Sequence, residues 1–137
     1  MIDVLQIRWE DAVQNGGAIG LRAALVRAWS ERFKTMPLWQ HEQTDRTRLA
    51  VLAILRTLDW KDAEVLRSAG HFAACGAAFE AMSETYPDDQ SADGMLWNAV
   101  QCFRAATRPA KAKALERRLA ERYPQSTYSA QLLSKSR

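Results

Sequence analysis

The sequence predicts an all-helical protein of stacked antiparallel hairpins, with about seven helices in 137 residues. Three observations favour this fold class. Glycine and proline are sparse, at 6 and 4 residues, while the side chains that lose least freedom in a helix recur throughout. Apolar residues recur with helical spacing. A stretch of 28 positions also matches the stretch that lies 37 residues further on.

The amino-acid composition limits the classes of protein to which the chain can belong. The chain is 47% hydrophobic and 26% charged, which is typical of a folded, water-soluble domain. No apolar run reaches the length of a membrane span, and the N-terminus lacks the basic start of a secretion signal. We therefore expect one domain over 1–137 in the cytoplasm. The periplasm is the alternative for a chain whose signal peptide has been removed.

The N-terminal helices show no clear repeat. A short helix near residues 4–14 should end at the breaker Asn15-Gly16-Gly17. A second helix near residues 19–36 carries an apolar stripe and should stop before Pro37.

The segment 38–43 is then expected to be a loop. Thr44 or Asp45 would be the N-cap of a third helix that ends at Leu58. This third helix is so rich in apolar residues that it should be deeply buried. Residues 1–56 as a whole are expected to form capping helices.

A repeat begins at Trp60. Eight of the 28 positions in 60–87 are identical after a shift of 37, where chance gives about two. The identical pairs are Trp60/Trp97, Arg67/Arg104, Ala69/Ala106, Ala73/Ala110, Ala77/Ala114, Glu84/Glu121, Tyr86/Tyr123 and Pro87/Pro124. One hairpin cannot bury its own apolar face, so copies stack. We expect hairpins over 57–92 and 93–130, the latter including a C-terminal helix.

A family resemblance follows from these motifs. The string Gly70-His71-Phe72-Ala73-Ala74-Cys75-Gly76-Ala77-Ala78-Phe79, with Tyr86-Pro87 after it, resembles the second helix of a tetratricopeptide repeat. The pattern is most similar to the subclass in the bacterial Tol-Pal coordinator and outer-membrane assembly lipoproteins. Leu96-Trp97-Asn98-Ala99-Val100-Gln101-Cys102-Phe103 resembles the next first helix, and Ala112, Leu119 and Tyr123-Pro124-Gln125-Ser126 its second.

The resemblance covers residues 57–130 and implies a right-handed α-solenoid whose first helices line a groove for a partner segment. The chain departs from the family pattern in two ways. Its period of 37 exceeds the usual length of about 34, which predicts a longer loop. Glu116 also stands where the pattern has an aromatic residue, which predicts looser packing of the second hairpin.

Two matching trios are the candidate binding residues. Each is spaced i, i+4, i+7, which places it on one helical face. The trios are Trp60, Glu64 and Arg67, and Trp97, Gln101 and Arg104. The resemblance implies that these positions line the groove, and Trp and Arg often dominate interfaces. Packing of the tryptophans between hairpins is the alternative. The trios predict a scaffold that binds a protein segment, a larger bacterial assembly or a second copy of the chain.

A basic C-terminal third suggests a different function. Residues 104–137 hold nine basic and two acidic side chains, and Lys111, Arg118 and Arg122 share one helical face. Such a face can bind nucleic acid or an anionic surface, or can simply be solvated. Nucleic acid is the weaker interpretation, because the chain has no aromatic platform or known nucleic-acid motif.

The sequence predicts neither an enzyme nor a cofactor. No set of titratable groups converges, and His41 and Asp45, four residues apart, are too few to predict a metal site. Cys75 and Cys102 lie twelve residues before and fifteen after Pro87, so they should be level on adjacent helices. A disulfide is conceivable in an oxidising compartment. We expect instead two reduced core cysteines, with Cα atoms within about 7 Å.

Overall fold

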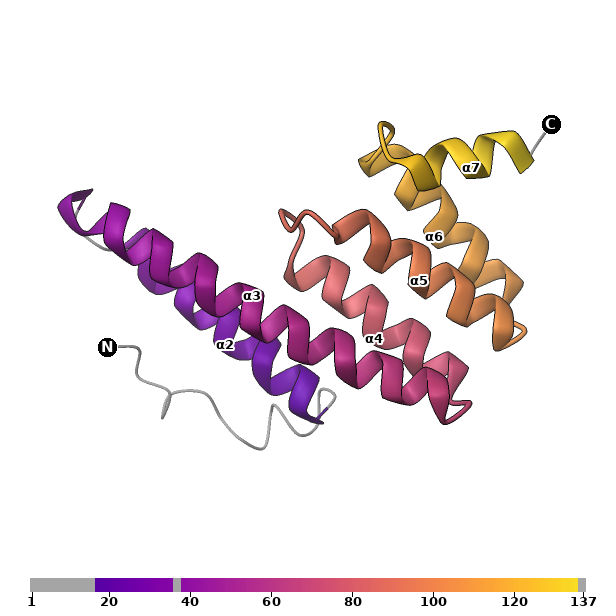
Figure 1. The fold of residues 1–137 in the computed structure, drawn as a ribbon, viewed down its shortest axis with the longest axis horizontal. Coiled ribbons are helices and arrows are strands. Elements are labelled where there is room, and N and C mark those ends of the chain that lie inside the picture. The colour runs from indigo at the N-terminus through magenta and orange to yellow at the C-terminus, as the bar shows by residue number, and fades with distance from the viewer. Residues whose placement is uncertain (1–16, 36–37, 136–137) are drawn as a thin grey trace. The chain divides into compact units, whose positions relative to one another are not determined.

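A computed structural model describes residues 17–35 and 38–135. This part of the chain forms six α-helices and no strand (Figure 1). They are α2 (Gly17–Lys34), α3 (Leu38–Ser68), α4 (Phe72–Thr85), α5 (Ala92–Ala105), α6 (Pro109–Arg122) and α7 (Thr127–Lys135). The prediction of an all-helical fold is confirmed. The helix expected near 4–14 lies outside the described residues.

The long helix α3 corrects the expected boundaries. The segment 38–43, expected as a loop, is helical, and the helix passes its expected end at Leu58 and continues to Ser68. The first helix of the first repeat is therefore the last part of α3. The physical reason is that no glycine or proline interrupts the chain between Pro37 and Gly70.

The expected deep burial of this helix is also wrong at three leucine and isoleucine positions. Leu49, Ile54 and Leu58 are 55%, 60% and 43% exposed. The apolar residues of this helix are distributed over all of its faces, but a helix buries only the face that a neighbouring element covers. The buried residue in this stretch is Asp59, whose carboxylate accepts a hydrogen bond from Arg22 of α2.

Contacts divide the chain after Asp59 into two compact units, 1–59 and 60–137, and α3 runs from the first into the second. In the second unit, α4 packs on α5 and α5 on α6, and α7 packs on both α5 and α6 (Figure 1). Its core is apolar. The largest fully buried apolar side chains are Phe79, Met82, Met95, Leu96, Val100, Leu115 and Leu119.

The predicted period of 37 recurs in the backbone where the first helix of each hairpin ends. Gly70, after α3, has φ 80°, and Thr107, after α5, has φ 58°. At the next residue, the amide of His71 donates to the Leu66 carbonyl and that of Arg108 to the Phe103 carbonyl, both at 2.9 Å. A left-handed residue with this bond is the Schellman ending. The same ending is thus built twice, once with glycine and once with threonine.

The second helices of the hairpins also end alike. Tyr86 has φ −122° and ψ 57° after α4, and Tyr123 has φ −129° and ψ 61° after α6. Their amides donate to Met82 and Leu119, which are again 37 residues apart. The side chains differ, because Tyr86 is buried whereas Tyr123 is half-exposed. The two tyrosines, which are equivalent in the repeat, therefore match in backbone conformation but differ in side-chain burial.

The matched turns predict opposite effects of exchanging their central residues. A β-branched residue is strained at positive φ, so Thr107→Gly should stabilise the fold by about 1 kcal/mol. Gly70→Thr should destabilise it by about 1–2 kcal/mol, because a Cβ there meets nothing within 4 Å and only the backbone is strained. Chemical denaturation of both variants measures these changes. Equal effects of one sign would contradict the equivalence of the two turns.

Candidate partner-binding site

The two predicted trios lie on neighbouring helices. Trp60, Glu64 and Arg67 occupy the last part of α3, and the second trio lies within α5. Arg67 of α3 donates from Nη2 to Asn98 Oδ1 of α5 at 2.7 Å. The predicted adjacency of these two helices is therefore present, and the remaining question is which side chains face outward.

The tryptophans make contacts within the chain. Trp60 meets Phe79 of α4 edge-on, with ring centroids 5.1 Å apart and planes at 80°. Trp97 stacks on Tyr128 of α7 at 5.1 Å and 19°. Both indoles are half-exposed. Each ring thus contributes to packing between helices, as the packing alternative requires, and keeps part of its surface open.

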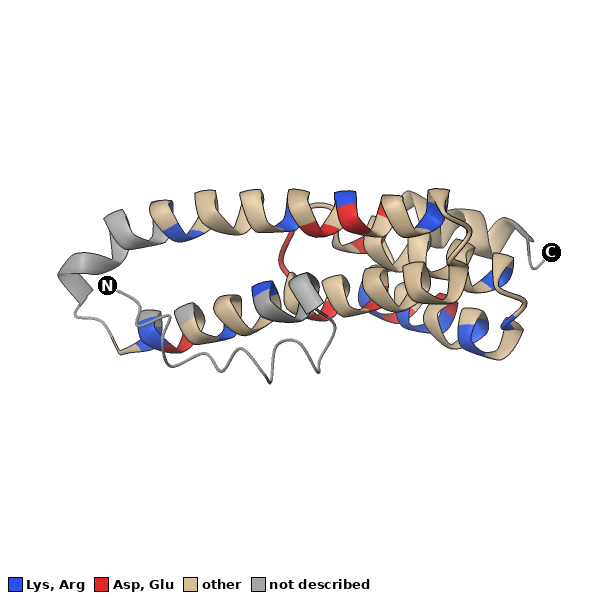
Figure 2. Ribbon diagram, turned by 90° about the horizontal axis from the view of Figure 1, so that it is seen from below, with Lys and Arg blue, Asp and Glu red and all other residues tan. Residues whose placement is uncertain are grey.

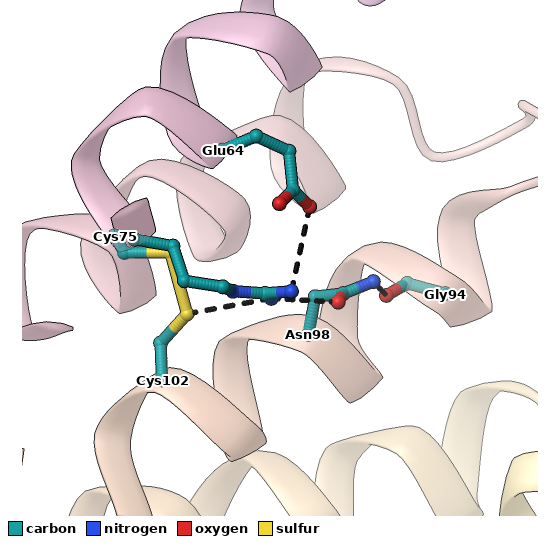
Figure 3. Close-up of polar contacts among 6 residues, drawn as sticks. Glu64, Cys75, Gly94, Asn98 and Cys102 are labelled. Carbon is teal, nitrogen blue, oxygen red and sulfur yellow. Dashed lines mark hydrogen bonds and ion pairs between the residues drawn. A yellow bond between two sulfur atoms is a disulfide. The ribbon is translucent and has the colours of Figure 1, made fainter. Parts of the chain in front are cut away.

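The guanidinium of Arg67 is held by internal partners (Figure 3). Besides Asn98, it contacts Cys102 Sγ at 3.6 Å and Glu64 Oε1 at 3.4 Å, and it lies 5.4 Å from the Phe79 ring centroid. The amide of Asn98 is oriented in turn, because its Nδ2 donates to the Gly94 carbonyl at 2.7 Å. The Arg67 side chain is 33% exposed. Its main role is to join helices.

Arg104 holds the equivalent place in the second hairpin, with a different partner. It forms an ion pair with Glu116 of α6, and its side chain stays 38% exposed. Glu116 stands 37 residues after Phe79, as Arg104 does after Arg67. The cation–π contact of Arg67 with Phe79 in the first hairpin is thus replaced by the ion pair of Arg104 with Glu116 in the second. This pairing accounts for the departure of Glu116 from the repeat pattern.

The predicted basic face is partly neutralised by acids from another helix. Lys111 Nζ lies 2.8 Å from Glu80 Oε1, and Arg118 Nη1 lies 3.6 Å from Glu84 Oε1. Both acids belong to α4, and Figure 2 shows acidic and basic residues interspersed along the helices of this unit. Arg122 is exposed. Sequence reasoning missed these acids because more than thirty residues separate them from their partners.

Within the described residues, no group of three or more His, Cys, Asp or Glu side chains could hold a metal ion. His41 and Asp45 fall within α3, but their side chains lie outside the part of the chain that is described. Among the helices of the described ranges, none is both long enough and apolar enough to cross a membrane.

The two cysteines are joined by a disulfide between α4 and α5, with Cα atoms 5.9 Å apart. The predicted proximity of Cys75 and Cys102 is confirmed, whereas the expectation that they stay reduced is contradicted by the bond. Spacing along the chain sets whether two residues lie at the same height along adjacent antiparallel helices. Only the rotation of each helix decides whether their side chains meet.

Comparison of the chain with protein-family models, with curated proteins and with solved structures finds no match.

Tyr123, beside the basic face, provides a pH-dependent probe. Burial raises the pKa of its hydroxyl above 10.0, Arg122 opposes the rise, and Asp88 and Asp93 add to it. Below the unfolded pKa the ring is neutral in both states. Above it the unfolded chain ionises first, so stability should fall as pH rises through the window between the two values.

We expect Tyr123→Phe to reduce this alkaline loss of stability, measured by denaturation at about pH 9 and about pH 11. The hydrogen bond from Tyr123 to the Pro87 carbonyl, 3.1 Å long, disappears in the same variant at every pH. An unchanged alkaline slope would contradict the assignment.

Proposed function

We propose that the protein is a non-catalytic scaffold that binds a segment of a partner protein along the outer face of α5. The observation that carries the proposal is the asymmetry of this helix. Met95, Leu96 and Val100 on one side are fully buried, while Arg104 is exposed and Trp97 and Gln101 are half-exposed. A helix with a closed inner side and an open Trp-Gln-Arg stripe is suited to protein binding.

The chemistry of the stripe suggests what it binds. A guanidinium has five N–H donors, and a carboxylate such as that of Glu116 accepts at most two of them well. The remaining donors of Arg104 are suited to backbone carbonyls or to an acidic side chain. Trp97, backed by Tyr128, offers a flat apolar surface beside them. The proposed partner is therefore an extended or helical segment with an acidic residue and an apolar anchor.

The two arginines are assigned different roles in this proposal. Arg67 was expected to bind the partner together with Arg104, but its internal contacts make it a positioning residue. Glu64 and Trp60 accompany it at the seam of α3 with its neighbours. The binding residues in the strict sense are then those of the second trio.

The tetratricopeptide-like character of the hairpins remains part of the proposal. It is supported by the 37-residue period in sequence and in helix endings, and by the neighbouring first helices. A scaffold of this kind acts within an assembly, and the partner is a different protein, a larger bacterial complex or a second copy of this chain.

Binding of nucleic acid or an anionic surface through Lys111, Arg118 and Arg122 is the alternative. The ion pairs with Glu80 and Glu84 count against it, because they lower the positive charge that phosphates would meet. If this alternative holds, affinity for a DNA duplex should fall by orders of magnitude between about 50 and 200 mM salt. Failure to bind in low salt, measured by fluorescence anisotropy, removes it.

The scaffold proposal is tested by a matched pair of double variants. Gln101→Ala/Arg104→Ala should weaken partner binding by about 1–3 kcal/mol per residue that is a hot spot. Lys113→Ala/Arg117→Ala, at exposed positions of α6, is the control and should bind like the wild type. The partner is identified by affinity capture with the wild type, and each affinity is then measured by calorimetry with purified components.

Both double variants should keep their helicity and thermal stability, because an exposed ion pair contributes less than about 1 kcal/mol. If the α5 variant binds normally, the proposed face is wrong. If only the α6 variant loses binding, the partner uses the face of α6 that carries Lys113 and Arg117 instead.

A further inference from the structure

The disulfide lies at a close approach of α4 and α5. Cys75 and Cys102 are 0% and 2% exposed, and each is followed by a residue of a second tight contact. Gly76 faces the Phe103 ring so closely that an added Cβ would lie 2.8 Å from it. Since a side chain at position 76 would push the helices apart, glycine is what lets the neighbouring cysteines meet.

The charged side chain of Arg67, from α3, contacts the disulfide at its Cys102 sulfur. Nη2 of Arg67 lies 3.6 Å from Cys102 Sγ, a contact that Figure 3 draws as a dashed line. The same nitrogen donates to Asn98 Oδ1, which holds the guanidinium in place. The two sulfurs are therefore not equivalent, because the recorded cationic contact is with Cys102.

We propose that Cys75–Cys102 is a redox-responsive linkage, in which local opening of α4 exposes the buried Cys75 to attack by a dithiol reductant and Arg67 holds the departing sulfur of Cys102. This inference is independent of the proposed binding face, since it concerns the buried side of α5. The asymmetry follows from the chemistry of exchange, in which the sulfur that is better stabilised as an anion leaves faster.

The electrons balance as follows. A thiolate of the reductant bonds to Cys75 Sγ, the protein S–S bond breaks, and its electron pair leaves on Cys102 beside Arg67. The second thiolate of the reductant then attacks its own sulfur bonded to Cys75. Cys75 leaves as a thiolate and takes up a proton, and the reductant becomes a cyclic disulfide. Two electrons pass from the dithiol to the protein.

Other charges near the sulfurs act against Arg67. Cys75 is in the first turn of α4 and Cys102 in the last turn of α5, so both helix dipoles favour the anion at Cys75. Glu64, 3.4 Å from Nη1, offsets part of the arginine charge. A helix end carries about half a charge. Arg67, even with its charge partly offset, is in direct contact with the buried sulfur of Cys102 at 3.6 Å, so its effect there exceeds that of the helix ends.

Reduction would change the connections of α5 selectively. The covalent link to α4 would open, while the link to α3 would strengthen, because a neutral contact at Cys102 becomes an ion pair with Arg67. Reduction thus replaces the covalent attachment of α5 to α4 by a stronger electrostatic attachment of α5 to α3.

Single-cysteine variants of the full chain test the assignment. Thiolate absorbance against pH should show Cys102, in Cys75→Ser, ionising at least about one pH unit below Cys75, in Cys102→Ser. Adding Arg67→Met to Cys75→Ser should abolish this difference, whereas Arg104→Met, the matched position of the second hairpin, should leave it unchanged. Ionisation of Cys102 at or above that of Cys75 overturns the proposal, as does indifference to Arg67.

The wild type provides the second arm. Dithiothreitol should raise its intact mass by two hydrogen atoms while circular dichroism shows retained helix, and oxidised glutathione should then remove them. A protein that never forms the bond, or one whose bond dithiothreitol opens only on unfolding, refutes the redox response. If Arg67→Met fails to fold, Arg67→Lys with Cys75→Ser replaces it and should place the ionisation between those of the parent and of Cys102→Ser.

Discussion

The side chain of Arg67 contacts Glu64 in its own helix, Phe79 in α4, and Asn98 and Cys102 in α5. A guanidinium that is two-thirds buried must find partners for its N–H groups, because an unpaired donor away from water costs several kcal/mol. That requirement fixes the end of α3 against the next two helices. The edge-on contact of Trp60 with Phe79 lies at the same junction of α3 and α4.

The second hairpin repeats this arrangement with one exchange. Arg104 keeps the arginine, but Glu116 replaces the ring, and the contact changes from cation–π to an ion pair at the surface. Trp97 then has no Phe79 equivalent to meet and stacks on Tyr128 of α7 instead. The repeated arginine is thus held by several internal partners in one hairpin and by a single carboxylate in the other. This difference is the reason to look for partner binding on α5 and for structural joining at α3.

Ion pairs between helices also determine how charge is distributed on the second unit. The basic C-terminal third looks uncompensated along the chain, yet α6 lays Lys111 and Arg118 against glutamates of α4. These pairs span the two hairpins and lie at or near the surface, where each contributes at most about 1 kcal/mol. Their effect is mainly on which molecules the face attracts, since a compensated face has little pull on phosphate.

By itself the sequence determined the helical class, the 37-residue period and the position of the two cysteines at the same height along adjacent helices. These depend on local propensity, on helix-ending residues such as Gly70 and Pro87, and on spacing, all of which act over a few residues. The sequence interpretation erred in ending the helix at Leu58, where no breaker stands, since α3 continues to Ser68 before the turn at Gly70. The sequence also could not say which arginine is internal, that Glu116 is the partner of Arg104, or that the cysteines bond. Those outcomes depend on the rotation of each helix against its neighbours, and only the packed structure sets that rotation.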